Sequence, residues 1–137
     1  MMHDELVTYE VAKLAKEKGF PQEPDHNDHS QTYCWDGLRN IHSLCKWEMW
    51  YSGEYNNEDM YAAPTQSLLQ RWLREEKNIH IEIVATASGY LWIADKVNGT
   101  AITDSDVLNR GINDGGCWDK YEQALEDALK YALENLV

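Results

Sequence analysis

Residues 79–103 constrain the fold of this chain more than any other segment. Residues 79–84 read Ile-His-Ile-Glu-Ile-Val, and this strict alternation is typical of a strand with one buried face. A turn signal at Gly89 and the hairpin dipeptide Asn98-Gly99 delimit two further strands, over residues 90–97 and 100–103. The segment therefore predicts a small antiparallel meander.

Three amphipathic segments with helix start and stop signals surround the meander. Thr8 is a good N-cap, Gly19 and Asn78 suit left-handed positions after a helix, and Asp119 has capping-box spacing to Glu122. The predicted helices span residues 8–18, 65–77 and 119–136. Helices packed with one small antiparallel sheet predict the α+β class and a single domain over residues 1–137.

Residues 21–62 lack this regularity and form an aromatic-rich insert. Tyr33 opens a short predicted strand that ends at Asp36-Gly37, and residues 46–51 predict a second strand. The segment has too many aromatic residues to be disordered, but its register stays open.

Composition excludes several classes of function. The chain has 24 acidic and 12 basic side chains and a net charge of −12, which argues against direct binding to nucleic acid or anionic lipid. No apolar run reaches the roughly 20 residues of a membrane span, and residues 1–5 do not resemble a secretory signal. The three cysteines, Cys34, Cys45 and Cys117, are therefore expected to be reduced thiols in the cytoplasm.

Three blocks of sequence carry a resemblance to a known family. Residues 61–83, which include Ala-Pro-Thr-Gln-Ser-Leu-Leu-Gln-Arg-Trp-Leu-Arg-Glu and Asn-Ile-His-Ile-Glu-Ile, resemble the central signature of small uncharacterised proteins from Bacteroides-type gut bacteria and their phages and prophages. Residues 12–20 and 121–130 resemble the same family's two end motifs. The resemblance implies a shared fold and a phage or mobile-element origin, but no catalytic or binding residue.

This chain departs from the family pattern in two places. Lys120 stands where relatives tend to carry Ser or Thr as the cap of the last helix, so we expect Asp119 to cap it instead. Residues 25–60 are also longer than in relatives, which makes the aromatic-rich insert specific to this member.

Two groups of residues have weak sequence signatures of a metal site or of acid–base catalysis. His26, His29 and Cys34 supply ligand types that zinc prefers, but their spacing matches no standard structural zinc site. His80 and Glu82 share one face of the first meander strand, a pairing able to exchange a proton and also common on solvent-facing strands. We therefore expect no cofactor and no catalytic site, and keep a metal-binding or hydrolytic enzyme as the alternative.

The leading hypothesis is an acidic, non-enzymatic protein that binds another protein. Exposed clusters of Trp and Tyr are typical of binding hot spots, and only the region of the second helix carries net positive charge. The candidate contact residues are Trp35, Trp47, Trp50, Tyr51 and Tyr55 in the insert and Arg71 and Arg74 on the second helix. A further alternative is a DNA mimic that occupies a host nucleic-acid-binding protein. The oligomeric state stays open.

Overall fold

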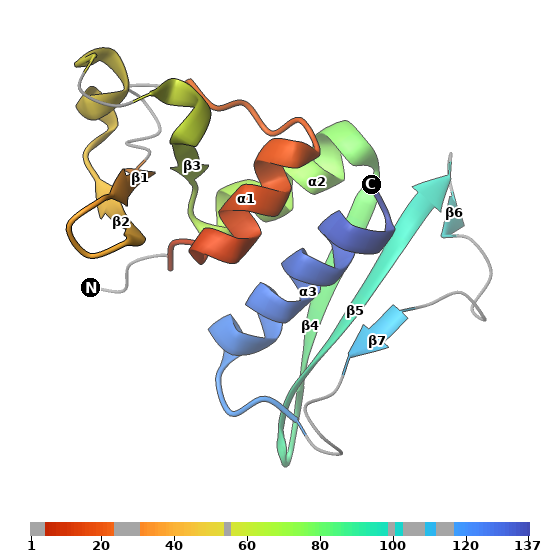
Figure 1. The fold of residues 1–137 in the computed structure, drawn as a ribbon. Helices are drawn as coiled ribbons and strands as arrows, with labels where there is room; N and C mark the ends of the chain where they lie inside the picture. Colours follow the sequence, from red (N-terminus) through yellow and green to blue (C-terminus); the bar gives the residue numbers. More distant parts are fainter. Residues whose placement is uncertain (1–4, 24–30, 54–55, 99–100, 103–108, 112–116) are drawn as a thin grey trace. The chain divides into compact units, whose positions relative to one another are not determined.

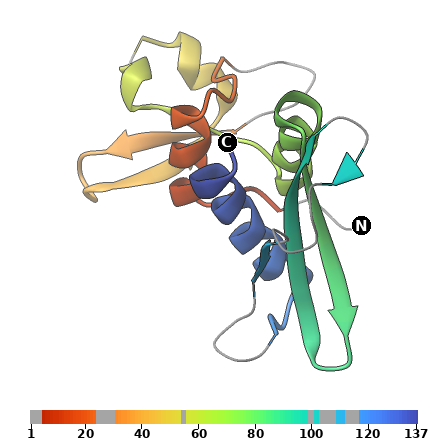
Figure 2. The same ribbon diagram turned by 90° about the vertical axis from the view of Figure 1, so that its right-hand side faces the viewer.

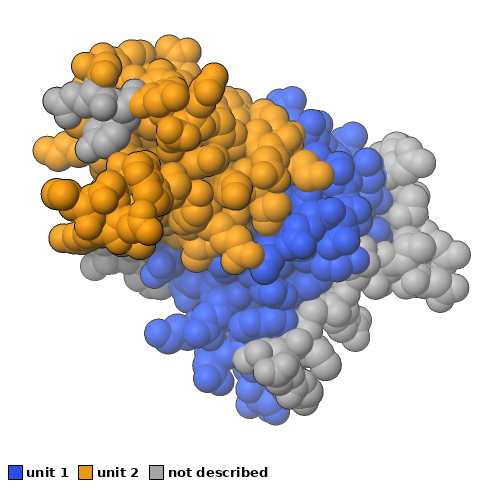
Figure 3. Space-filling view, in the orientation of Figure 1, with its two compact units in different colours: residues 1–5, 66–137 blue, residues 6–65 orange. Residues whose placement is uncertain are grey.

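The computed structural model describes residues 5–23, 31–53, 56–98, 101–102, 109–111 and 117–137 (Figure 1). Helices and small antiparallel sheets make it an α+β protein, as predicted. The chain divides into two compact units, one of residues 6–65 and one of residues 1–5 and 66–137 (Figure 3). The single domain over residues 1–137 stays a prediction.

The unit of residues 66–137 contains the predicted meander and two of the predicted helices. Its elements are α2 (Gln66–Lys77), β4 (Ile79–Thr86), β5 (Gly89–Asn98), β6 (Ala101–Ile102), β7 (Asn109–Gly111) and α3 (Tyr121–Asn135). Strands β4 and β5 form a long antiparallel hairpin, and β6 and β7 both pair with the other edge of β5. Helix α3 lies along the hairpin (Figure 1) and packs on both of its strands and on α2.

The alternation in β4 sets which face of this sheet is buried. Ile79 and Ile81 are buried, whereas His80 and Glu82 point to the exposed face. The turn of the hairpin requires a glycine, because Gly89 has φ +140° and a Cβ there would lie 2.5 Å from the carbonyl oxygen of Trp118. Trp118 comes this close because its backbone pairs with that of Tyr90.

The helix boundaries follow the capping signals in two cases and differ in one. Thr8 caps α1 (Tyr9–Glu17) by accepting a hydrogen bond from the Val11 N–H, as predicted. Asn78 adopts φ +57° after α2, as predicted. The prediction that Asp119 caps α3 is wrong, because Lys120 is the N-cap and its backbone N–H donates to Oε1 of Gln123. Half of a capping box therefore replaces a side-chain cap at Lys120.

The unit of residues 6–65 is a second small sheet with α1 packed on it. Its elements are α1 (Tyr9–Glu17), β1 (Gln31–Asp36), β2 (Ile41–Cys45), the 3₁₀ helices η1 (Trp47–Tyr51) and η2 (Asn57–Asp59), and β3 (Tyr61–Ala63). All pairings are antiparallel and the strand order is β2-β1-β3. Helix α1 packs on β3, and in Figure 2 the tip of the orange β1–β2 hairpin extends beyond α1.

The structure corrects the prediction for residues 46–51. The backbone N–H of Met49 bonds to the carbonyl of Lys46, and that of Ser52 to the carbonyl of Met49, which is the i to i+3 pattern of a 3₁₀ helix rather than a strand. The strand that forms a hairpin with β1 is β2, one segment earlier, and it was not predicted. Among the described residues, no helix combines the length and the apolar composition that crossing a membrane requires.

Candidate functional site

Among the residues that the structure describes, the β1–β2 hairpin presents the largest concentration of exposed apolar side chains. Its four-residue turn is held by Asp36, whose Oδ1 accepts the backbone N–H of Leu38 at 3.0 Å and of Arg39 at 3.3 Å. Asn40 closes the turn with φ +60°, a conformation that Asn tolerates better than most residues. Local turn chemistry therefore fixes where the hairpin reverses.

The register of the hairpin gives it two chemically different faces. Cys34 lies opposite Ser43 and Cys45 lies opposite Thr32, so these four residues share one face. The other face carries the two pairs formed by Trp35 with His42 and by Tyr33 with Leu44.

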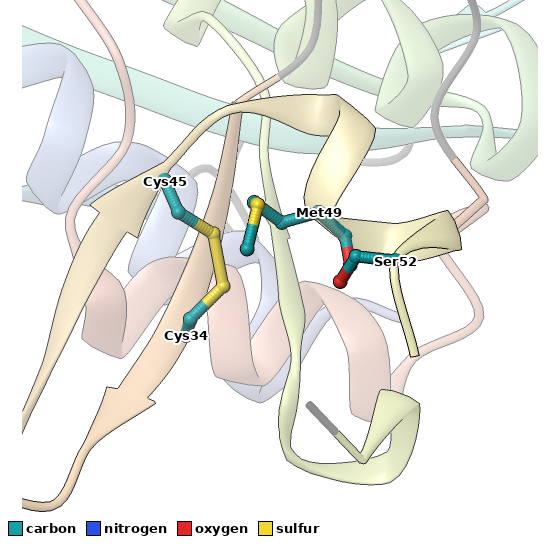
Figure 4. Close-up of a disulfide and its surroundings, with 4 residues drawn as sticks. All are labelled: Cys34, Cys45, Met49 and Ser52. Atoms are coloured by element: carbon teal, nitrogen blue, oxygen red, sulfur yellow. A yellow bond between two sulfur atoms is a disulfide. The ribbon is translucent and has the colours of Figure 1, made fainter. Parts of the chain in front are cut away.

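A disulfide joins Cys34 and Cys45 across the first of these faces (Figure 4). The prediction of reduced thiols is therefore wrong for these two residues. The physical reason is the unpredicted strand β2, which brings the two Cα atoms to 6.3 Å, within the usual range for a disulfide. Met49 of η1 points toward the disulfide in Figure 4.

Four large apolar side chains of the hairpin are exposed. Their exposed fractions are 41% for Trp35, 100% for Leu38, 50% for Ile41 and 48% for Leu44. The described residues contain two other large apolar side chains of this kind, Tyr51 and Tyr121, and they lie on different elements. Exposed apolar residues that gather on one element are typical of an interaction surface, whereas scattered ones are normal.

Aromatic contacts hold the second face of the hairpin against α1. The ring of Tyr9 stacks on His42 with centroids 4.3 Å apart, and the rings of Tyr33 and Tyr61 meet Tyr9 edge-on. Trp35 packs at the outer end of this group, 5.1 Å from His42. These contacts anchor the hairpin as far as the Trp35–His42 pair near its turn, whereas Leu38 in the turn is exposed.

Burial shifts the pKa of two residues of α1, Tyr9 and Lys16. Burial raises the pKa of Tyr9 above its usual value, and the neighbouring Tyr61 and Asp59 act in the same direction. Burial lowers the pKa of Lys16, while Asp59 and Glu58 oppose the shift. Lys16 Nζ donates to the carbonyls of Glu58 at 2.8 Å and Met60 at 3.0 Å, so it acts as a structural cation.

The aromatic residues predicted to bind a partner differ in their burial and lie on different elements. Trp35 and Tyr51 are exposed, and the Tyr51 hydroxyl donates to Oε1 of Glu23 at 3.1 Å. Trp50 is half-buried, and Trp47 begins η1. Tyr55 lies outside the described residues. Of the five, Trp35 alone belongs to the β1–β2 hairpin.

An ion pair within α2 offsets part of the positive charge that its composition indicates. Arg71 and Arg74 are both exposed on α2, but Arg71 forms an i,i+4 ion pair with Glu75, with Nε and Oε1 3.0 Å apart. The pair neutralises part of the helix face that was predicted to meet an acidic partner.

Of the three metal-ligand candidates that the sequence offered, Cys34 is engaged in the disulfide. Cys34 is buried in the disulfide, so its sulfur is not a thiolate that can bind zinc in this state. His26 and His29 lie outside the described residues. His80 and Glu82 are exposed on β4, and the described residues contain no group of three His, Cys, Asp or Glu side chains able to hold a metal ion.

Sequence reasoning missed Leu38, Ile41 and Leu44 because it did not predict β2. The signal was present in the turn residues, since Asp36-Gly37 and Asn40 bracket a short loop between two strand-like segments. The aromatic residues drew attention to the segment after β2 instead.

Comparison with known proteins adds no relative from which a site can be transferred. None of the family models, curated protein sequences and solved structures compared with this chain matches it.

Proposed function

We propose that this chain is a protein-binding protein that holds its partner through the β1–β2 hairpin. The observation that supports the proposal is the gathering of Trp35, Leu38, Ile41 and Leu44, all at least 41% exposed, on one hairpin. Burying such side chains stabilises a complex by roughly 25 cal/mol per Å² of apolar surface removed from water. Tyr51 on the adjacent η1 is a further exposed aromatic residue of this unit.

The chemistry of the hairpin defines the kind of partner. Arg39 is the one charged residue in the segment 37–45, and it lies 3.8 Å from the Asp36 carboxylate. The surface is therefore apolar and locally neutral on a chain whose net charge is −12. It suits a partner protein with an apolar cleft, and the acidic remainder of the chain favours a partner that is basic around that cleft.

Site-specific photo-crosslinking tests the proposal in the cell that carries the gene. A photoreactive phenylalanine analogue replaces Leu38, which is fully exposed, so the replacement leaves the packing unchanged. The control carries the same analogue at Arg74, on the exposed face of α2 that the sequence offered as the alternative surface.

We expect Leu38 to yield one discrete protein adduct and Arg74 to yield none. An adduct at Arg74 alone would move the binding surface to α2, and absence of an adduct at both positions would contradict the proposal.

The remaining expectations of the sequence stay predictions. These are the phage or mobile-element origin, the cytoplasmic location, the metal-dependent or hydrolytic enzyme and the DNA mimic. The disulfide bears on the location, because disulfides in the cytoplasm of ordinary bacteria are usually transient or redox-sensing.

A further inference from the structure

The Cys34–Cys45 disulfide and the exposed side chains of Trp35 and Leu44 occupy equivalent diagonals on opposite faces of the hairpin. Cys45 lies two residues beyond Ser43, the partner of Cys34, and Leu44 lies two residues beyond His42, the partner of Trp35. The bond between the sulfur atoms therefore fixes the register that brings Trp35 and Leu44 together on the other face. A slip of one residue would turn every side chain of β2 to the wrong face.

Strand β2 is an edge strand, held otherwise by its pairing with β1 and by the ring of His42, which packs on Tyr9, Trp35 and Tyr61. Within the described part of the chain it pairs with β1 alone, whereas β1 lies between β2 and β3. None of its five residues is buried. Edge segments without buried residues open at low free energy, so the disulfide adds a covalent attachment to the contacts that His42 makes.

Cys45 is the more accessible residue of the disulfide. Cys34 is 2% exposed, whereas Cys45 is half-buried on the edge strand. A thiolate from solvent therefore reaches Sγ of Cys45 more readily than Sγ of Cys34.

Among the described residues, the side chain of Thr32, opposite Cys45, adds no hydrogen bond that would hold β2 in place. Thr32 lies directly opposite Cys45 on the same face and is fully buried. Its Oγ1 has no hydrogen-bond partner in the region that the structure describes.

We propose that the Cys34–Cys45 disulfide is a redox switch that controls the protein-binding surface of the hairpin. In the oxidised form β2 is held in register, which keeps Leu44 on the same face as Trp35 and Ile41 next to the turn. Reduction by a dithiol releases β2 and disperses that surface. The control of binding rests on the function proposed above, whereas the release of β2 does not.

The chemical step is ordinary thiol–disulfide exchange. A thiolate of the dithiol attacks Sγ of Cys45, the bond between the two protein sulfurs breaks, and Cys34 leaves as a thiolate that takes up a proton. The second thiol of the reductant then attacks the sulfur bound to Cys45, frees Cys45 as a thiol and closes the reductant into a disulfide. Two electrons and two protons pass from the dithiol to the protein.

Hydrogen exchange measured by mass spectrometry tests the release of β2. The full chain with Cys117→Ser, which removes the remaining free thiol, is compared before and after treatment with dithiothreitol. We expect the amides of residues 41–45 to exchange about tenfold faster or more after reduction, because their opening no longer breaks a covalent cross-link. The amides of β4 and β5 serve as the internal control and should not change.

A Cys34→Ser/Cys45→Ser variant in the same background completes the test. It should exchange like the reduced protein and should not respond to dithiothreitol. Equal exchange of residues 41–45 in the oxidised and reduced protein would overturn the switch, as would two free thiols in the air-oxidised protein.

The crosslink at Leu38 connects the switch to binding. Its yield should fall when the oxidised protein is replaced by the Cys34→Ser/Cys45→Ser variant. An unchanged yield would overturn control of binding even if β2 is released. No crosslink in either form, with faster exchange after reduction, would contradict the proposed function and leave the release of β2 supported.

Discussion

Single residues stabilise the unit of residues 6–65 through polar contacts to its backbone. Lys16 is the clearest case, because its ammonium group donates to three backbone carbonyls and lies 4.7 Å from the centre of the Tyr61 ring. Its neighbour Lys13 is exposed on the same helix. Substitutions at Lys16 and Lys13 therefore compare an ammonium group that has hydrogen-bond partners with one that faces solvent.

Replacing Lys16 by Met keeps the apolar stem and removes the charge and the donors. We expect Lys16→Met to lower the free energy of unfolding by about 1–2 kcal/mol, since the carbonyls of Asn57, Glu58 and Met60 lose their donor. Lys13→Met should change it by less than about 0.5 kcal/mol. Urea denaturation measures both, and equal effects would contradict the role given to Lys16.

Tyr9 makes the stability of this unit depend on alkaline pH. Its folded-state pKa is raised, first by burial and then by Tyr61 and Asp59, so folding favours the neutral phenol. That contribution is complete below the unfolded pKa near ~10 and is lost as pH rises through the higher folded value. The unfolding free energy of the Tyr9→Phe variant should therefore fall less above about pH 10 than that of the wild type.

Ultraviolet titration of the tyrosinates gives an independent check on Tyr9. Tyr9→Phe should remove a group that ionises late in the titration of the folded protein. If the variant loses an early-titrating group instead, the assignment to Tyr9 fails.

At the scale of elements, the regular part of the chain was predictable and the hairpin was not. The meander could be predicted from the alternation in residues 79–84, and helix α1 from the cap at Thr8, because each signal is local. Strand β2 has no clear alternation, since its buried neighbours are a disulfide and an aromatic group contributed from elsewhere in the chain. The candidate site lies on that non-local element, so the sequence located its neighbourhood through Trp35 and missed its other residues.

The end of α2 offers a matched pair of substitutions at one backbone position. Asn78 has φ +57°, which glycine adopts freely and a β-branched residue does not. Asn78→Gly should leave the melting temperature nearly unchanged, whereas Asn78→Val should cost about 1–2 kcal/mol of stability. Calorimetry distinguishes the two, and similar losses for both variants would show that the Asn side chain, rather than the backbone conformation, determines stability there.

At the scale of the whole chain, a strong net negative charge accompanies a β1–β2 hairpin that is neutral and apolar. A net charge of −12 makes long-range attraction to a basic partner strong at low salt, and salt screens that attraction over about 10 Å at 0.1 M. Contacts made by Trp35 and Leu44 do not weaken in this way. Salt therefore separates a complex held by the hairpin from one held by a DNA-like array of carboxylates.

The central claim is that the hairpin binds a partner protein, and the most direct measurement is the affinity of the purified, oxidised chain for the protein crosslinked at Leu38. Calorimetric titration in high salt compares the wild type with Trp35→Ser/Leu44→Ser and with Tyr121→Ser, which removes an exposed aromatic residue from α3. We expect the wild type and Tyr121→Ser to bind equally and the hairpin variant to bind at least about tenfold more weakly, with an unchanged circular dichroism spectrum. Equal affinity of all three proteins, or loss of wild-type binding in high salt, would contradict the account.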